Sequence, residues 1–167
     1  MNAIIGITEL VLGTPLAPKQ AEYLRMVLQS SESLLGVIND VLDFSKVESG
    51  KVELEHLPFS LRECLGDALK SLALRANEKG IELALDVEPD VPDWLEGDAG
   101  RLRQVVINLV GNSIKFTPRG EVVVEVSVKD QREWHVELLI CVADTGIGIS
   151  PDKLEKVFEA FEQADAS

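Results

Sequence analysis

Asparagine and lysine recur at helical spacing in the stretch "VINLVGNSIKFT", residues 106–117. Asn108, Asn112 and Lys115 follow at steps of four and three, so they share one face of the predicted helix. Asparagine is a poor helix former, and its repetition therefore calls for a chemical reason. An amide oxygen is a hard, neutral ligand that suits Mg²⁺, and a lysine ammonium adds a point charge for phosphates. The whole polar stripe comprises Arg101, Gln104, Asn108, Asn112 and Lys115.

A second chemical signal is the hexapeptide "DTGIGI", which follows a predicted strand. Asp144 at the strand end can accept a hydrogen bond from an exocyclic amine such as that of adenine. Gly146 and Gly148 allow backbone conformations and close ligand approach that a side chain would prevent. An asparagine pair on a helix is more often surface polarity, and a DxGxG segment is more often a turn. Both signals, in this order and with a strand between them, indicate a site for a magnesium-bound nucleotide.

Composition narrows the classes of protein that these residues can belong to. The 167 residues include 29 acidic and 16 basic ones, for a net charge of −13, which argues against nucleic acid or anionic lipid as the main partner. No apolar run approaches the roughly 20 residues that a membrane span needs, and no signal peptide is visible. We expect Cys64 and Cys141 to be buried thiols in a reducing compartment, and the chain to be soluble and cytoplasmic, without membrane contact.

The first fifty residues have a helical pattern throughout. A helix in "NAIIGITELVLG" breaks at Pro15 and Pro18, and a much longer helix follows. Steps of four and three along the long helix define a heptad seam, which comprises Leu24, Leu28, Ser31, Leu35, Ile38, Leu42 and Ser45. Val27, Leu34 and Val41 widen this seam. We expect two copies of the hairpin to form a four-helix bundle, and the alternative is packing on the rest of the same chain.

After residue 50 the pattern alternates between strands and helices. A short extended stretch precedes an amphipathic helix over 61–80, whose predicted inner face comprises Leu61, Leu65, Leu69, Leu72 and Ala76. An alternating stretch follows over 81–92, then a strand over 121–129 and a more fully buried one over 134–144. Between them lies the asparagine helix, capped by Asp98, with a predicted apolar face of Val106, Leu109, Val110 and Ile114. A last helix is predicted to begin at Ser150 and Pro151. The fold class is α+β, an α/β sandwich with the helices on one face of the sheet.

The motifs together resemble those of sensor histidine kinases. "NLVGNSIKFT" resembles their N box, "DTGIGI" their G1 box and "FEAFEQAD" their F box, within the ATP-binding fold of the GHKL superfamily. The first fifty residues resemble the dimerisation and phosphotransfer hairpin in the form common among hybrid kinases.

This resemblance implies roles for individual residues. Asn112 would be the Mg²⁺ ligand and Asn108 its partner and second candidate ligand, and Lys115 would meet the ATP phosphates. Phe116 would pack near the adenine, and Asp144 would bind the adenine amine. Gly146 and Gly148 would shape that side of the pocket, and Phe158 and Phe161 would hold the region leading to the ATP lid.

The resemblance also implies boundaries: a hairpin over 1–50, a linker and first strand over 51–59, and an ATP-binding domain over 60–167. The family's phospho-acceptor histidine would lie upstream of Met1, and its glycine-rich G2 box and last strands beyond Ser167, so we expect a piece that is inactive by itself. We expect His56 and His135 to be structural or surface residues.

Three functions remain open. The first is a histidine kinase core that binds Mg²⁺ and ATP and passes the γ-phosphoryl group through a histidine to a response regulator aspartate. The second is a GHKL ATPase, but Asn108 stands where those enzymes carry a glutamate, and an amide cannot take a proton from water. The third is a non-catalytic segment that forms a homodimer and binds a response regulator.

Overall fold

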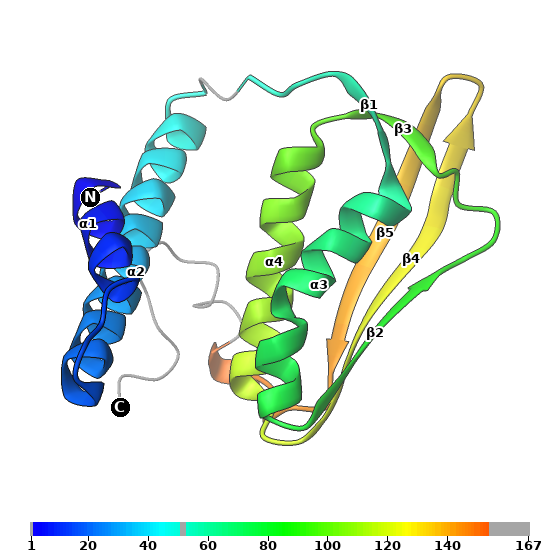
Figure 1. Ribbon diagram of the computed structural model, residues 1–167. Helices are drawn as coiled ribbons and strands as arrows, with labels where there is room; N and C mark the ends of the chain where they lie inside the picture. Colours follow the sequence, from blue (N-terminus) through cyan, green and yellow to red (C-terminus); the bar gives the residue numbers. More distant parts are fainter. Residues whose placement is uncertain (1, 51–52, 154–167) are drawn as a thin grey trace. The chain divides into compact units, whose positions relative to one another are not determined.

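The computed structural model describes residues 2–50 and 53–153, which divide into two separately packed units with the boundary in the chain after Glu53. The first unit holds α1 (Asn2–Leu12) and α2 (Pro18–Glu48), which pack against each other (Figure 1). The helical conformation is interrupted between them, at the predicted prolines. Pro18 occupies the first turn of α2, and the Gln20 side chain accepts a hydrogen bond from the Ala17 amide at 3.1 Å. The predicted helical hairpin is confirmed.

The predicted seam on α2 is only partly covered within one chain. Leu24, Leu28 and Leu35 are half-buried, whereas Ile38 is exposed and Leu42 is 54% exposed. An apolar groove of about 350 Å³ lies beside the seam, lined by Ile4, Met26, Val27, Ser30, Ser31 and Leu34. The hairpin therefore leaves much of its apolar surface in solvent.

The second unit is built on a three-stranded sheet of order β2-β4-β5. β2 (Ile81–Val87) pairs parallel to β4 (Gly120–Arg132), and β4 pairs antiparallel to β5 (His135–Asp144), with a register shift between Val128 and Asp130. A separate antiparallel ribbon joins β1 (Leu57–Ser60) to β3 (Trp94–Gly97). The helices α3 (Leu61–Glu78) and α4 (Ala99–Phe116) lie side by side on one face of the larger sheet (Figure 1). This arrangement confirms the predicted α+β sandwich.

The core lies between these two helices and the sheet. All five residues predicted for the inner face of α3 are buried, as are Val106, Val110 and Ile114 of α4. From the sheet, Val122, Val124 and Val126 of β4 are buried against them. Apolar side chains repeat about every 3.6 residues along the helices and every 2 residues along the strand, so they all face one continuous apolar layer.

The helices α3 and α4 both begin at a side-chain cap. Ser60 Oγ accepts a hydrogen bond from the Glu63 amide at 3.1 Å, and Asp98 Oδ1 accepts one from the Arg101 amide at 2.9 Å. The Asp98 cap was predicted and is confirmed. The backbone hydrogen bond from Arg101 is the largest cause of the lowered pKa of the Asp98 carboxyl.

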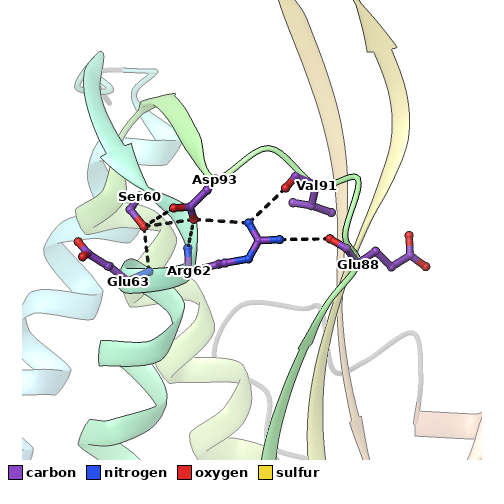
Figure 2. Close-up of polar contacts among 6 residues, drawn as sticks. All are labelled: Ser60, Arg62, Glu63, Glu88, Val91 and Asp93. Atoms are coloured by element: carbon purple, nitrogen blue, oxygen red, sulfur yellow. Dashed lines mark hydrogen bonds and ion pairs between the residues drawn. The ribbon is translucent and has the colours of Figure 1, made fainter.

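A polar clasp formed by Ser60, Arg62 and Asp93 joins the start of α3 to the loop between β2 and β3 (Figure 2). The Asp93 carboxylate accepts hydrogen bonds from the Arg62 amide at 2.9 Å and from Ser60 Oγ at 3.0 Å. The Arg62 guanidinium also donates to the carbonyl oxygens of Glu88 and Val91, each at 3.2 Å. The pKa of Asp93 is lowered, first by the Arg62 backbone hydrogen bond.

Several predictions on the second unit need correction. Leu109 is not in the core but 48% exposed, since it lies on the solvent side of α4. β5 is not fully buried but alternates between half-buried and exposed residues, because it lies at an edge of the sheet and helices cover only one face. Cys141 is exposed on the uncovered face for the same reason, while Cys64 is buried as predicted.

One strand was missed, and one predicted helix is described only at its start. The short strand β3 was not predicted, because four residues carry too little alternation to be recognised. After Ser150 the described residues form a 3-10 turn, Pro151–Lys153, and the rest of the predicted last helix, with Phe158 and Phe161, lies outside the described residues.

Candidate functional site

The polar stripe of α4 faces away from the core. Asn108, Asn112 and Lys115 are all exposed, and neither asparagine amide makes a hydrogen bond to another described residue. The Lys115 ammonium lies 4.9 Å from the centroid of the Phe116 ring, within reach of a cation–π contact. The amide oxygens and the ammonium group are therefore available to a ligand on this face.

An apolar stripe, formed by Val105 and Leu109, runs beside the asparagines on the same exposed face of α4. Val105 is 55% exposed and Leu109 is 48% exposed. Sequence reasoning missed this stripe because apolar residues in a helix were assigned to the core. Its signal was the angular position of Leu109, which lies about 60° around the helix from Asn112 but about 100° from Val110.

The predicted glycine loop, residues 144–148, meets the C-terminal end of α4. The Ile147 amide donates a hydrogen bond to the Phe116 carbonyl at 3.3 Å. On its other side, Thr145 Oγ1 accepts a hydrogen bond from the Glu121 amide at 3.0 Å, and the Thr145 amide donates to the Glu121 carbonyl at 3.2 Å. The loop is thus fixed between the last turn of α4 and the first residues of β4.

Glycine is required where Thr145 contacts the start of β4. Gly120 has a φ of +122°, and a Cβ added there would lie 2.0 Å from Thr145 Oγ1. No other residue fits this backbone and this contact. Gly120 therefore allows the close contact between the start of β4 and the glycine loop, although its own position carries no chemistry.

Gly146 lies in a notch lined by oxygen atoms. A Cβ added to it would lie 2.7 Å from the Phe116 carbonyl oxygen, 2.8 Å from Asp144 Oδ1 and 2.9 Å from Thr117 Oγ1. No side chain fits, so the notch holds the backbone close to both polar side chains. Gly148 instead has a φ of +68° with open space around it, so its role is to turn the chain.

Asp144 and Thr117 present complementary hydrogen-bonding groups at this notch. Asp144 pairs with the buried Val122 across the sheet, which places it on the side that the helices cover. Its Oδ1 accepts a hydrogen bond from the Gly146 amide at 2.9 Å, which leaves Oδ2 as an acceptor. Thr117 Oγ1 is fully buried and has no hydrogen-bond partner among the described residues. Sequence reasoning missed Thr117, because nothing in its type or spacing marks it.

These features fit an adenine nucleotide and a magnesium ion. A carboxylate acceptor next to a hydroxyl suits the amine-bearing edge of a purine, and exposed amides beside an ammonium suit Mg²⁺ with phosphates. Within residues 2–50 and 53–153, no group of three histidine, cysteine or acidic side chains could hold a metal ion by itself.

The two histidines of the chain lie outside the candidate site. His56 precedes β1 and His135 begins β5, and both are exposed. No described helix is long and apolar enough to cross a membrane.

This fold and site define a class: an α/β sandwich whose candidate site lies at the end of an asparagine-bearing helix. Comparison with known proteins is consistent with it. Residues 97–167 match the family of histidine kinase-, DNA gyrase B- and HSP90-like ATPases, and residues 1–50 match the His Kinase A (phospho-acceptor) domain.

Relatives match along the whole chain. It is 46% identical to the sensor protein GacS of Pseudomonas syringae pv. syringae and 45% identical to the signal transduction histidine-protein kinase BarA of Escherichia coli K12, each over all 167 residues. Full-length ShkA, solved in complex with AMPPNP, is 36% identical over 98% of this chain, with a TM-score of 0.81. The chain therefore belongs to the histidine kinase family, whose members are transferases of two-component signalling. It spans 18% of the length of GacS and BarA, and 34% of ShkA.

Proposed function

We propose that this chain is the catalytic and dimerisation core of a hybrid sensor histidine kinase, which binds ATP with Mg²⁺ and directs its γ-phosphoryl group to a histidine. That group would then pass to an aspartate of a response regulator. One observation carries the proposal: the asparagine stripe and the Asp144–Thr117 notch meet at the same end of α4.

The adenine would lie at the notch. Asp144 Oδ2 would accept the hydrogen bond of the exocyclic amine, and the buried Thr117 hydroxyl would supply a further polar contact on that edge. The exposed Phe116 ring would cover part of the base. The structure of ShkA with AMPPNP supports nucleotide binding by this fold in a relative.

The phosphates would lie along the asparagine stripe. Asn112 would be the metal ligand, with Asn108 as the second candidate one turn earlier, and Lys115 would neutralise phosphate charge. When bound, Mg²⁺ supplies charge neutralisation and a template for the phosphate oxygens. The chain's own residues contribute by holding the substrate in position, which is a large part of catalysis in phosphoryl transfer.

Phosphotransfer is favoured over hydrolysis by the same helix. A hydrolase needs a side chain that takes a proton from water, and Asn108 cannot do so at neutral pH. We keep the expectation that neither His56 nor His135 is the phospho-acceptor, because each is a lone exposed imidazole and neither belongs to the hairpin.

The hairpin would provide dimerisation and the surface for the response regulator. The seam of Leu24, Leu28, Leu35, Ile38 and Leu42 would form the interface between two copies, since Ile38 and Leu42 remain exposed in one chain. We place the hairpin at residues 1–50, the linker at 51–59 and the ATP-binding domain at 60–167. A cytoplasmic location follows from the need for ATP.

The proposal is tested by measuring the dissociation constant of AMPPNP with Mg²⁺ for the Asn112→Ala and Asp144→Asn variants, with Asn77→Ala as a control. Asn77 lies in the last turn of α3 and is exposed, so its substitution should leave affinity unchanged. Asn112→Ala should abolish the Mg²⁺-dependent part of binding, and Asp144→Asn should weaken binding with or without Mg²⁺. Unchanged affinity in both variants, with the fold intact by circular dichroism, would refute the site.

A further inference from the structure

Lys79 contacts the last turn of α4, which the glycine loop also contacts. It ends α3, and its own amide donates a hydrogen bond to the Ala76 carbonyl at 3.1 Å. The next residue, Gly80, turns the chain into β2 with a φ of +65°. From this anchored position the Lys79 ammonium reaches α4, where it donates hydrogen bonds to the carbonyl oxygens of Ile114 at 2.8 Å and Lys115 at 2.9 Å.

The last four carbonyls of an α-helix have no partner within the regular helix, so their partners determine how the helix ends. In α4 these carbonyls belong to Ser113, Ile114, Lys115 and Phe116. The Thr117 amide donates a hydrogen bond to the Ser113 carbonyl at 2.9 Å. The Ile147 amide donates one to the Phe116 carbonyl at 3.3 Å. Lys79 takes the two between them. Each carbonyl is therefore satisfied, and Lys79 accounts for half of them.

The partners on either side of Lys79 belong to the candidate site. Thr117 carries the buried hydroxyl at the notch, and Ile147 belongs to the glycine loop that holds Asp144 and Gly146. Lys115 and Phe116, whose side chains face the proposed nucleotide, lie on the same turn. A shift of this turn would therefore move both sides of the site at once.

Charge gives a second reason for a lysine at this point. The C-terminal end of a helix carries a partial negative charge, which is unfavourable beside a polyanion such as ATP. An ammonium group on the last-turn carbonyls offsets that charge. A neutral donor would satisfy the carbonyls but would not reduce the repulsion.

We propose that Lys79 is a positioning residue for the nucleotide site, which fixes the C-terminal turn of α4 against the glycine loop and neutralises the negative end of the helix. It has no direct contact with the substrate in this role. The proposal rests on the function proposed for the site, but its structural part concerns the turn itself and can be tested without a nucleotide.

The test compares Lys79→Met, Lys79→Arg and the wild-type chain, with Lys70→Met as the matched control. Lys70 lies on the same helix and pairs only weakly with Asp67 at 3.4 Å, with its side chain 81% exposed. Two quantities are measured: the hydrogen-exchange rates of individual backbone amides by NMR, and the dissociation constant of AMPPNP with Mg²⁺.

In Lys79→Met, the Thr117 and Ile147 amides should exchange at least about fivefold faster, and AMPPNP should bind about three- to tenfold more weakly. Lys79→Arg should restore both quantities to within about twofold of wild type, because it retains the charge and the donors. Lys70→Met should match wild type.

A merely structural role in the turn after α3 would give a different pattern: faster exchange at Gly80 and Ile81, with wild-type rates at Thr117 and Ile147. That result would overturn the proposal, as would a Lys79→Arg variant as impaired as Lys79→Met. A wild-type chain that does not bind AMPPNP would instead refute the proposed function, and the exchange rates would still decide the role of Lys79.

Discussion

Replacing Gly146 by alanine is the perturbation whose effect the geometry defines best. The added Cβ would lie within 3.0 Å of three oxygen atoms, and one of them, the Phe116 carbonyl oxygen at 2.7 Å, belongs to the backbone. That contact cannot be relieved by a side-chain rotation. Relief therefore requires the glycine loop and the end of α4 to separate by a few tenths of an ångström.

Such a separation has a calculable cost. The hydrogen bond from the Ile147 amide to the Phe116 carbonyl is already 3.3 Å long, so the shift would break it. Losing this hydrogen bond would lower the free energy of unfolding by about 0.5–1.5 kcal/mol, and overpacking at a tight site lowers it by about 1–3 kcal/mol. Because part of the strain is relieved by the same movement, we expect the free energy of unfolding to fall by about 1–3 kcal/mol.

The effect on nucleotide affinity should be at least as large. A hydrogen bond to a charged group such as the Asp144 carboxylate contributes about 1.5–3 kcal/mol, and displacing it would weaken AMPPNP binding about 10- to 150-fold. Urea unfolding followed by circular dichroism gives the first quantity, and calorimetric titration gives the second.

Gly66→Ala is the matched control, because a Cβ at Gly66 in α3 meets no atom within 4 Å. It should stabilise the chain by about 0.5–1 kcal/mol and leave affinity unchanged, since alanine favours a helix interior. A Gly146→Ala variant with wild-type stability and affinity would show that the notch does not determine the position of Asp144.

Two further predictions concern the clasp and the hairpin. The folded state lowers the pKa of Asp93, so its carboxylate stabilises the chain above the unfolded pKa, and this stabilisation is lost as the pH falls below about 4. In urea unfolding, Asp93→Asn should therefore be less stable than wild type at pH 7 but lose less stability between about pH 5 and pH 3; equal losses would contradict the role of the clasp. Leu42→Glu should raise the dimer dissociation constant at least about tenfold in analytical ultracentrifugation, because a leucine leaves the proposed interface. Leu74→Glu on α3, where the leucine is 70% exposed, is the control, and a wild-type chain that is monomeric at high concentration would refute the seam.

The periodicity of apolar residues predicted most of the fold, because the clearest patterns extend over many residues. The inner face of α3 and the strand over 121–129 were identified correctly, since each pattern repeats over several turns or residue pairs. Leu109 was misplaced because a helix with a wide apolar face can also expose apolar residues, and hydropathy alone does not separate the two. β5 was misjudged because its place at the sheet edge depends on pairing between distant segments.

The site shows the same division between local and distant signals. Asn108, Asn112, Lys115 and Asp144 could be selected from residue type and spacing, and their family roles remain predictions. The notch at Thr117 and the contact of Lys79 with α4 could not, because each depends on segments that are distant in the sequence, such as Lys79 and Ile114 at a separation of 35 residues, and that meet only in the folded chain. Thr117 and Lys79 are ordinary residues in the sequence, and only their partners give them a role.

The central claim is that Mg²⁺ and an adenine nucleotide bind at the end of α4. Calorimetric titration of this chain with AMPPNP, with and without Mg²⁺, tests it most directly. We predict binding of one AMPPNP per chain that strengthens markedly when Mg²⁺ is present and is competed by ADP. No binding by a sample whose circular dichroism shows a folded chain, or binding that Mg²⁺ does not affect, would contradict the account.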